Sequence, residues 1–585
     1  MIDTRFQFDL EAVPFSRRGS YLAFSLYGDA TQQQIYRPTG RSEHSGVYLR
    51  TVRNGGECSR LLHIELLVDG SPTPCRVEGS PALLRLSLPG APERCAEFCI
   101  VNEETVRVRT RGVGLRFSAE TGDSPFDNAF SPDGVRVNVI CFRARLKLAF
   151  IPLSGVLTLD APWSVAKSDY IRIDLQPSTG AAEADCIIEG FDSTLEPRTY
   201  SETFEAQVSA VERDYADWLA ATLPVPEAYA ATRKLAAYIN WSCTVRPRGH
   251  FTRPAMFMSK NWMARIWSWD NCFNALGLAR QDPALAWDQL FIFFDHQDRH
   301  GALPDHLVET GGSWSFYKPP VHGWAVRGLL QRQNEYDPER LRALYEPLCR
   351  WTDWWFTYRD DDGDGIPQYN HGNDSGWDNG TAFGEGVPVE CPDLSAYLIL
   401  QMDALAQIAG QLGHDDDQQQ WSARADALLE RMIAHFWVGD RFVSRRSGSH
   451  EVPAGDNLLN YVPIVLGSRL PQPQRGALAA GLERFLTPYG LATEHPNSPL
   501  YEPDGYWRGP IWAPSTMLIF DGLLNGGYPE LAATIAERFC AMAARSGMAE
   551  NYDALTGEGL RDRAYTWTAS VFLLLANHLL ERSTT

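Results

Sequence analysis

The residues best suited to chemistry lie in segment 371–379, a polar, glycine-rich stretch in which Trp377 directly precedes Asp378. An indole face stacks on the C–H bonds of a sugar, and a carboxylic acid held against it loses hydration, which raises its pKa. A protonated carboxyl group beside such a platform suits the general acid of glycoside cleavage. An Asp in a Ser-Gly-x-Asp loop is also ordinary turn chemistry, so the motif alone leaves both interpretations open.

Cleavage of a glycosidic bond with inversion needs a second carboxylate, which activates water on the opposite face of the sugar. The C-terminal part of the chain offers Glu550, Asp553 and Glu558. Glu550 stands beside Asn551 and Tyr552, which could hold a water molecule and orient the carboxylate, whereas Glu558 lies in a Thr-Gly-Glu-Gly sequence typical of a turn. The residues favour Glu550 and leave the other two open.

Composition narrows the class of substrate. The 585 residues are 44% hydrophobic and 22% charged, which is enough for a large core and two domains. A net charge of −20 argues against nucleic acid and anionic membranes as partners and favours a small carbohydrate substrate. The eleven cysteines form no CxxC pair, and we expect them to be reduced. Without a signal-like N-terminus or a long apolar run, the sequence predicts a cytoplasmic protein.

The chain changes character near residue 226. Residues 1–205 read as short alternating runs split by Gly, Pro, Ser and Asn, which predicts an antiparallel β-sandwich. A charged helical linker, 206–225, follows, and Pro224 and Pro226 mark the start of an all-helical catalytic domain, 226–585.

Twelve helices are predicted in this second domain. Their expected spans are 226–247, 270–280, 283–299, 321–334, 338–358, 393–412, 418–437, 456–466, 473–487, 512–524, 529–546 and 565–581. Helices starting near 270, 393, 456, 512 and 565 are apolar on most sides, while those starting near 283, 338, 418, 473 and 529 carry many charges. Apolar helices must be buried and charged ones must cover them, which predicts the inner and outer rings of an (α/α)6 toroid.

In such a toroid every connection from an outer to an inner helix emerges on the same rim. The polar and aromatic motifs of the chain all fall in these connections, so we expect a sugar-binding cleft there. Its predicted substrate-binding residues are Trp269, Asp270, Trp324, Trp377, Trp507, Arg508 and Trp512. Asp270 could alternatively serve as a helix cap, although a cap has no need of a neighbouring indole.

Three motifs in this order resemble glycoside hydrolase family 63, with the trehalases more distantly similar. They are Ser375-Gly376-Trp377-Asp378-Asn379, the run from Tyr506 to Trp512, and Glu550-Asn551-Tyr552 followed by Thr556-Gly557. Trp269-Asp270 also looks like the glycone-binding segment of that clan. The resemblance covers roughly 260 to 580 and implies an inverting α-glucosidase-type enzyme with a β-sandwich and an (α/α)6 barrel, Asp378 as general acid and Glu550 as general base.

The family acts on glucosylated glycans, small disaccharides and sugar-glycerate compounds, so the resemblance does not name the aglycone. A glycerate group would need a cation, which Arg508, Arg265 or Lys318 could supply. We therefore predict an inverting glycoside hydrolase that cleaves an α-glucosidic bond in a small glucoside or oligosaccharide. A phosphorylase or lyase on the same toroid, and a non-catalytic glycan-binding protein, are the alternatives.

No cofactor and no catalytic metal are expected. Asp360, Asp362 and Asp364 match the first half of an EF-hand loop, but the twelfth position is His371 where a bidentate Glu belongs, so an Asx-rich turn competes with a calcium site. His296 and His300 have helical spacing but lack the Glu of an HExxH zinc motif.

Overall fold

The computed structural model describes residues 6–28, 45–56, 59–333 and 337–584. The chain divides into two compact units. Unit 1 comprises residues 1–220, 237–246 and 259–264, and unit 2 comprises residues 221–236, 247–258 and 265–585. Cys58 and the predicted helix end at 334 lie outside the described residues.

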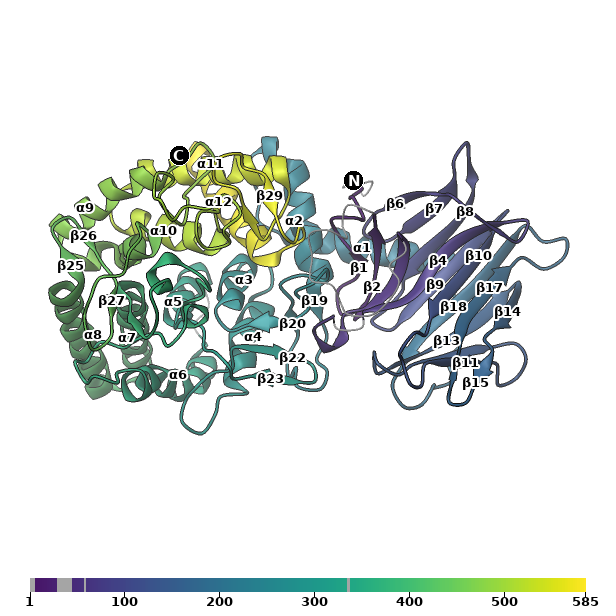
Figure 1. Cartoon of the computed structure of the whole chain (residues 1–585), viewed down its shortest axis with the longest axis horizontal. Helices are drawn as coiled ribbons and strands as arrows, with labels where there is room; N and C mark the ends of the chain where they lie inside the picture. The colour runs from purple at the N-terminus through teal and green to yellow at the C-terminus, as the bar shows by residue number, and fades with distance from the viewer. Residues whose placement is uncertain (1–5, 29–44, 57–58, 334–336, 585) are drawn as a thin grey trace. The chain divides into compact units, whose positions relative to one another are not determined.

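Unit 1 contains two antiparallel sheets (Figure 1). One has the order β1 (Phe15–Ser16), β2 (Leu22–Tyr27), β3 (Gly46–Thr51), β4 (Arg60–Val68), β10 (Gly114–Glu120), β17 (Tyr170–Gln176) and β14 (Val156–Asp160), with β5 (Ser71–Thr73) on β4. The other has the order β11 (Asn128–Phe130), β12 (Val137–Cys141), β13 (Leu146–Ser154), β18 (Glu183–Phe191), β9 (Thr105–Arg111), β8 (Ala91–Ile100), β7 (Leu84–Leu88) and β6 (Arg76–Gly79).

Apolar and polar residues alternate along the strands, so that one face of each strand contributes to a shared hydrophobic core. In β17, Ile171, Ile173 and Leu175 are buried while Arg172 between them is exposed. These side chains join residues of the second sheet, such as Phe98 and Phe150, in one hydrophobic cluster. The two sheets therefore pack face to face, as the period-two pattern predicted.

The helices follow in chain order. They are α1 (Phe204–Ala221), α2 (Ala230–Cys243), α3 (Asp270–Leu278), α4 (Pro283–Phe294), α5 (His322–Arg332), α6 (Pro338–Tyr358), α7 (Pro392–Leu412), α8 (Asp415–Phe436), the 3-10 segment η5 (Leu458–Arg469), α9 (Gln472–Leu482), α10 (Ala513–Asn525), α11 (Pro529–Ser546) and α12 (Thr566–Thr584). Several begin where proline fits the first turn, as at Pro283, Pro338 and Pro529.

Among the described residues of unit 2, six of these segments close a ring (Figure 1). α3 packs on α5, α5 on α7, α7 on η5, η5 on α10, α10 on α12, and α12 returns to α3. Outside them, α4 packs on α3, α8 on α7, α9 on η5, and α11 on both α10 and α12. The connections into the ring segments lead to their N-terminal ends, where the motifs of the sequence lie.

Two expectations about these helices were wrong. The segment predicted as a helix over 456–466 is a 3-10 segment, because Pro463 lies inside it and Gly467 has a non-helical conformation. The helix starting at 283 was expected to be charged, but α4 carries a single charged residue, Asp288, and most of its side chains are buried.

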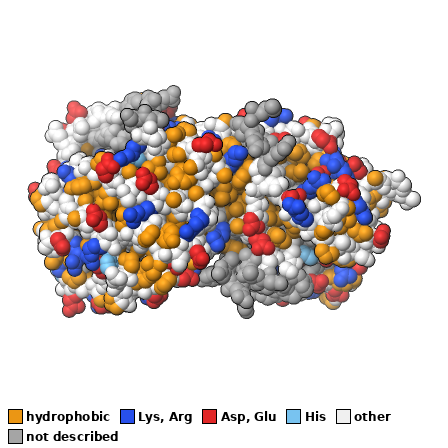
Figure 2. All heavy atoms as spheres, turned by 90° about the horizontal axis from the view of Figure 1, so that it is seen from above, with side chains coloured by type: hydrophobic (Ala, Val, Ile, Leu, Met, Phe, Trp, Pro, Cys, Tyr) orange, Lys and Arg blue, Asp and Glu red, His pale blue; other side chains and the backbone are white. Residues whose placement is uncertain are grey.

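The surface charges and the cysteines of the described residues give no further indication of function. Figure 2 shows acidic and basic side chains interspersed on the face it draws. Ten cysteines lie in the described part of the chain, and all ten are free thiols. No helix there is long and apolar enough to cross a membrane.

Candidate active site

Asp378 sits on a loop that its own sequence holds in shape. The buried Asp374 carboxylate accepts the backbone N–H groups of Tyr317 at 2.9 Å and Asn370 at 3.0 Å. Gly376 then adopts a left-handed conformation, with φ of 76°, directly against the Trp269 ring. The loop thus presents Trp377 buried and Asp378 half-buried.

Residues 371–379, which carry Asp378 and are called the acid loop below, are joined by hydrogen bonds to segment 505–507, which precedes α10. The Asn379 side chain donates to the Gly505 carbonyl at 3.0 Å and accepts the Trp507 backbone N–H at 3.0 Å. Tyr506 between them has φ of 63°, a left-handed conformation that is uncommon outside glycine. The two bonds from Asn379 fix the strained residue in place.

Glu550 contacts this same segment. It lies near the start of the connection between α11 and α12, just before the short strand pair β28 (Asn551–Tyr552) and β29 (Gly559–Leu560). The Tyr506 hydroxyl donates to Glu550 Oε1 at 2.9 Å. Segment 505–507 therefore contacts both Glu550 and the neighbour of Asp378.

Both carboxyl groups have raised pKa values. Burial raises the pKa of Glu550 to about 7, and Asp562 adds to the rise, while the hydrogen bond from Tyr506 opposes it. Burial also raises the pKa of Asp378, Lys318 opposes this, and the negative charge of Asp305 adds to it.

Lys318 and Asp305 form a charged pair beside Asp378. The buried Lys318 ammonium lies 3.4 Å from Asp305 Oδ1 and 3.9 Å from Asp378 Oδ1, and it donates to the Asn373 carbonyl at 2.8 Å. Burial acts to raise the pKa of Asp305, but a hydrogen bond from His306 and the charge of Lys318 outweigh it and lower the pKa. The acid loop thus faces one fixed cation and one ionised carboxylate.

Asp270 is buried in the first turn of α3. Its side chain does not cap the helix, and Oδ2 has no hydrogen-bond partner among the described residues. Burial raises its pKa well above the usual range, Lys318 opposes this, and Asp305 and Asp378 add to it. A buried carboxylate oxygen without a partner is costly unless a ligand satisfies it.

The buried indoles of the predicted site pack against one another as one group. Trp507 and Trp512 stack with ring centroids 4.0 Å apart and planes 5° apart. Trp377 lies 4.8 Å and Trp269 6.2 Å from Trp507, measured between centroids. Trp567, which was not among the predicted substrate-binding residues, lies 5.7 Å from Trp269 and extends this group of indoles.

Two predicted substrate-binding residues have partners of their own. The Trp324 indole N–H donates to Asp521 in α10 at 2.9 Å. The Arg508 guanidinium is paired with Glu502. Their part in substrate binding stays a prediction.

Asp553 and Glu558, the alternatives to Glu550 as the second carboxylate, lie in a turn, whereas Glu550 contacts Tyr506. Glu558 is exposed in the turn between β28 and β29, and Asp553 accepts the backbone N–H of Leu555 at 2.7 Å within that turn. The expectation that Tyr552 orients Glu550 was wrong, because its hydroxyl donates to the Gly547 carbonyl at 2.6 Å. Tyr506 makes that contact instead, and it was overlooked although it stands beside Trp507 in the motif.

Two further residues were missed. Asp305 lies in an unremarkable Pro-Asp-His sequence, which offers no signal. Tyr565 is buried, and the charges of Glu550 and Asp270 raise its pKa further after burial does so, which places it near both. It stands two residues before Trp567 in an aromatic run that could have drawn attention.

Buried carboxyl groups of raised pKa beside a group of indoles are the arrangement of a carbohydrate-cleaving enzyme, a glycoside hydrolase. The chain belongs to the mannosylglycerate hydrolase MGH1-like glycoside hydrolase family, whose domain model matches residues 263–568. The resemblance to glycoside hydrolase family 63 is thereby confirmed.

Similarity to individual proteins supports this family membership. The chain is 26% identical to a mannosylglycerate hydrolase of Thermus thermophilus over 411 residues, 56% of this chain and 96% of the relative. It is 24% identical to a glucosylglycerate hydrolase of Mycolicibacterium hassiacum, over 53% of this chain and 91% of the relative. A bacterial glucoamylase solved with acarbose shares the fold, with a TM-score of 0.63 at 11% identity, over 98% of this chain and 95% of that one.

Proposed function

We propose that this protein is an inverting glycoside hydrolase that cleaves an α-linked small glycoside at the mouth of an (α/α)6 toroid. One observation carries the proposal: segment 505–507 contacts both Glu550, through Tyr506, and Asn379, the neighbour of Asp378, and both carboxyl groups have raised pKa values. An inverting enzyme needs such a pair of carboxyl groups, with room for water between one of them and the sugar.

Asp378 is proposed as the general acid. Its raised pKa keeps a proton available for the glycosidic oxygen. The Lys318 ammonium at 3.9 Å can stabilise the carboxylate that remains after the proton has left.

Glu550 is proposed as the general base. A pKa of about 7 leaves a large ionised fraction at neutral pH, and such a value is well matched to taking a proton from water. The Tyr506 hydroxyl holds Oε1, so the other carboxylate oxygen can accept the proton.

The glycone is proposed to lie against Trp269, Trp377, Trp507 and Trp512, with Asp270 accepting a sugar hydroxyl. Asp270 Oδ2 supports this, because a ligand hydroxyl would satisfy a buried acceptor that otherwise has no partner in the described residues. Trp324 and Arg508 are proposed to reach substrate only once their bonds to Asp521 and Glu502 have rearranged.

A glucoside or mannoside of glycerate is proposed as the substrate. The relatives are named for these compounds. A glycerate carboxylate would need a cation, and Lys318 is held beside Asp378, where the leaving group would lie. We further propose a β-domain over 1–205, a linker over 206–225, a catalytic domain over 226–585, and action in the cytoplasm on small carbohydrates.

Sugar release from a panel of substrates tests the proposal. Glucosylglycerate, mannosylglycerate, trehalose and other α-linked disaccharides would be assayed with wild type, Asp378→Asn, Glu550→Gln and the control Glu558→Gln. We expect hydrolysis of a glycerate glycoside, a loss of at least about 1,000-fold in turnover in the first two variants, and none in the control.

Other outcomes would overturn it. If turnover required inorganic phosphate and yielded a sugar phosphate, the protein would be a phosphorylase. If Glu550→Gln kept near-normal activity while Glu558→Gln lost it, the assignment of the base would be wrong. A wild-type protein that cleaved no member of the panel would contradict the substrate class.

A further inference from the structure

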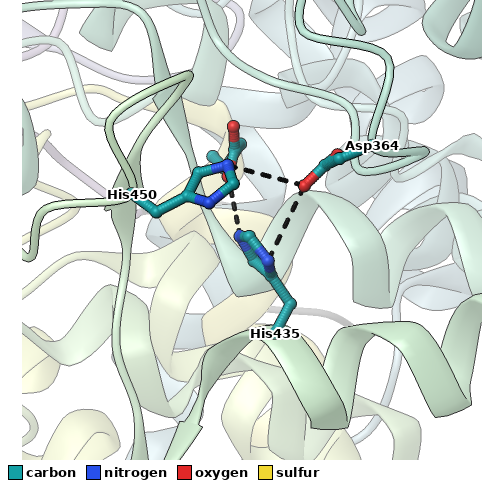
Figure 3. Close-up of side chains that lie close together, drawn as sticks. Asp364, His435 and His450 are labelled. Atoms are coloured by element: carbon teal, nitrogen blue, oxygen red, sulfur yellow. Dashed lines mark hydrogen bonds and ion pairs between the residues drawn. The ribbon is translucent and has the colours of Figure 1, made fainter.

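A second cluster of ionisable side chains lies apart from the proposed catalytic residues. It consists of Asp364 in the loop after α6, Glu390 in the short strand β24 (Val389–Glu390), His435 in the last turn of α8, and His450 just after β27 (Arg445–Arg446). Figure 3 shows Asp364, His435 and His450 pointing toward one another from three separate segments. The sequence analysis singled out Asp364 only, as part of a possible calcium loop, because the four residues are spread over 87 positions, from 364 to 450.

The ligand atoms lie at distances suited to one small ion. His450 Nε2 is 3.7 Å from Asp364 Oδ2 and 3.8 Å from Glu390 Oε2, and His435 Nδ1 is 3.7 Å from Asp364 Oδ2. One ligand atom from each residue can be chosen so that all four lie within 4.8 Å of one another. Tetrahedral zinc with bonds of about 2.0–2.2 Å separates its ligands by about 3.3–3.6 Å, which is close to the three distances of 3.7–3.8 Å.

Glu390 is a second, independent indication. Its side chain is fully buried, and Oε2 accepts from His435 Nε2 at 2.7 Å. Oε1 is also buried and has no hydrogen-bond partner among the described residues. A buried carboxylate oxygen is costly to leave unsatisfied, and a cation would satisfy it.

The surroundings hold the two imidazoles in place. The Arg445 guanidinium donates to the backbone carbonyl of His435 at 2.7 Å and to that of His450 at 2.9 Å. Arg445 donates to backbone oxygens in these two bonds, and the carboxylates of the cluster pair with the imidazoles. Asp362 adds further negative charge, with Oδ2 3.2 Å from His450 Nε2.

We propose that Asp364, Glu390, His435 and His450 bind a divalent transition metal ion of the zinc class. Two imidazoles with two carboxylates suit zinc, whereas calcium takes oxygen ligands only. The competing calcium loop is incomplete, because His371 at its twelfth position accepts the Asn373 backbone N–H at 2.9 Å. The carboxylates of Asp360 and Asp364 also accept backbone N–H groups, from Gly365 at 3.0 Å and Ile366 at 2.7 Å, as in an Asx-rich turn.

Such an ion would act on the loop that carries Asp378. Asp364 and Glu390 flank residues 365–389, and this segment contains Asp374, Trp377 and Asp378. The ion would tie both ends of the segment to α8 and to the chain at His450. Its role would be structural, because it replaces several weak contacts at the base of the loop by metal bonds.

Metal binding by untagged, full-length protein tests the inference. We expect purified protein to carry or take up about one Zn²⁺ per chain, measured by mass spectrometry of the metal and by titration calorimetry. Chelation should lower the Tm by several degrees, and Zn²⁺ but not Mg²⁺ should restore it. This part needs no substitution and so does not depend on a variant folding.

Matched variants locate the site. His450→Asn keeps a residue that tolerates the left-handed backbone at position 450, where φ is 55°, and Glu390→Gln keeps the size of the side chain. Each should lose zinc affinity by at least about 100-fold, while His414→Gln, at the opposite end of α8, should bind as wild type does. Equal zinc affinity in wild type and His450→Asn would overturn the proposal, as would a Tm restored by Ca²⁺ and not by Zn²⁺.

Discussion

At the scale of single residues, we expect the contact between Tyr506 and Glu550 to set the pH dependence of the proposed reaction. The bond from the Tyr506 hydroxyl lowers the pKa of Glu550 against the larger effect of burial. In wild type, kcat/KM should depend on pH in a bell-shaped curve, rising as Glu550 ionises and falling as Asp378 loses its proton, with the pKa of each group raised above its ordinary value by burial. The two apparent pKa values of this profile describe the coupled pair of carboxyl groups and not either residue alone.

Tyr506→Phe should move the rising limb of this profile to higher pH, because the bond that stabilises ionised Glu550 is lost. Turnover at pH 7 should fall by about 10-fold or more. Tyr501→Phe is the matched control, since Tyr501 lies in the same connection but its hydroxyl has no hydrogen-bond partner among the described residues. A rising limb that stays in place in Tyr506→Phe would show that Tyr506 does not tune the base.

Asp270 is expected to recognise a sugar hydroxyl. Asp270→Ala should weaken kcat/KM by roughly 2–4 kcal/mol, because a hydroxyl of the bound sugar then lacks its partner. Asp415→Ala, in the first turn of α8, tests the general effect of removing an acidic residue near a helix N-terminus. If Asp270→Ala lowered the Tm but left the kinetics unchanged, Asp270 would serve the helix only.

Only those site residues that stand in a recognisable motif could be predicted from the sequence. Trp377, Asp378 and Glu550 stand in motifs whose composition points to sugar chemistry. Tyr506 was hidden by the stronger signal of Trp507, and Asp305 carries no local signal at all. Such contacts depend on which loops meet in space, and a linear sequence does not give this.

At the scale of elements, the acid loop depends on a close approach between Gly376 and Trp269. A Cβ atom at Gly376 would lie 2.4 Å from Trp269 Cζ2, and φ there is 76°. Gly376→Ala should therefore lower the free energy of unfolding by more than about 2 kcal/mol and turnover by at least about 10-fold. Urea unfolding and steady-state kinetics would measure the two effects.

Gly413 provides the control for backbone strain alone. It has φ of 78° at the end of α7, and a Cβ atom there would meet nothing within 4 Å. Gly413→Ala should cost about 1 kcal/mol and leave turnover unchanged. Equal losses in both variants would mean that the contact with Trp269 does not matter.

Periodicity predicted the helices well and their packing less well. Each of the twelve segments predicted over 226–585 contains a helix in the described residues, but η5 is a 3-10 segment because of Pro463. α4 shows the limit of counting charges: its aromatic side chains, including Trp287 and Phe293, are buried although it packs outside the ring. Burial of an outer helix is decided by what covers it, which its own sequence does not contain.

At the scale of the whole molecule, the part that matches the family model lies in the helical unit. The family model matches residues 263–568, and the mannosylglycerate hydrolase of Thermus thermophilus is matched over 96% of its length by 56% of this chain. The glucoamylase fold, in contrast, spans 98% of the chain. The alternation of the first 205 residues predicted the sheets, but it gave no indication of what they contribute to activity.

Burial of Glu550 should cost the molecule stability. Its pKa is raised from 4.5 to about 7, so the folded protein binds more protons than the unfolded chain between these values, and stability falls as the pH rises through this window. Glu550→Gln should therefore raise the free energy of unfolding by up to about 3 kcal/mol at pH 8 and by little at pH 4.

Urea unfolding at both pH values measures this gain, with exposed Glu558→Gln as the control that should change nothing. A gain in Glu550→Gln that is equal at pH 4 and pH 8 would contradict the link to ionisation. No gain at either pH would mean that the buried carboxylate is already compensated.

The central claim is that Asp378 and Glu550 cleave an α-glycoside by direct attack of water, and the anomer released first tests it most directly. Proton NMR during the first minutes of hydrolysis of the best substrate from the panel would follow both anomers before they interconvert. Direct attack predicts the β-anomer first and no covalent sugar on the enzyme. The α-anomer appearing first, or a glycosyl group trapped on Glu550, would contradict the account.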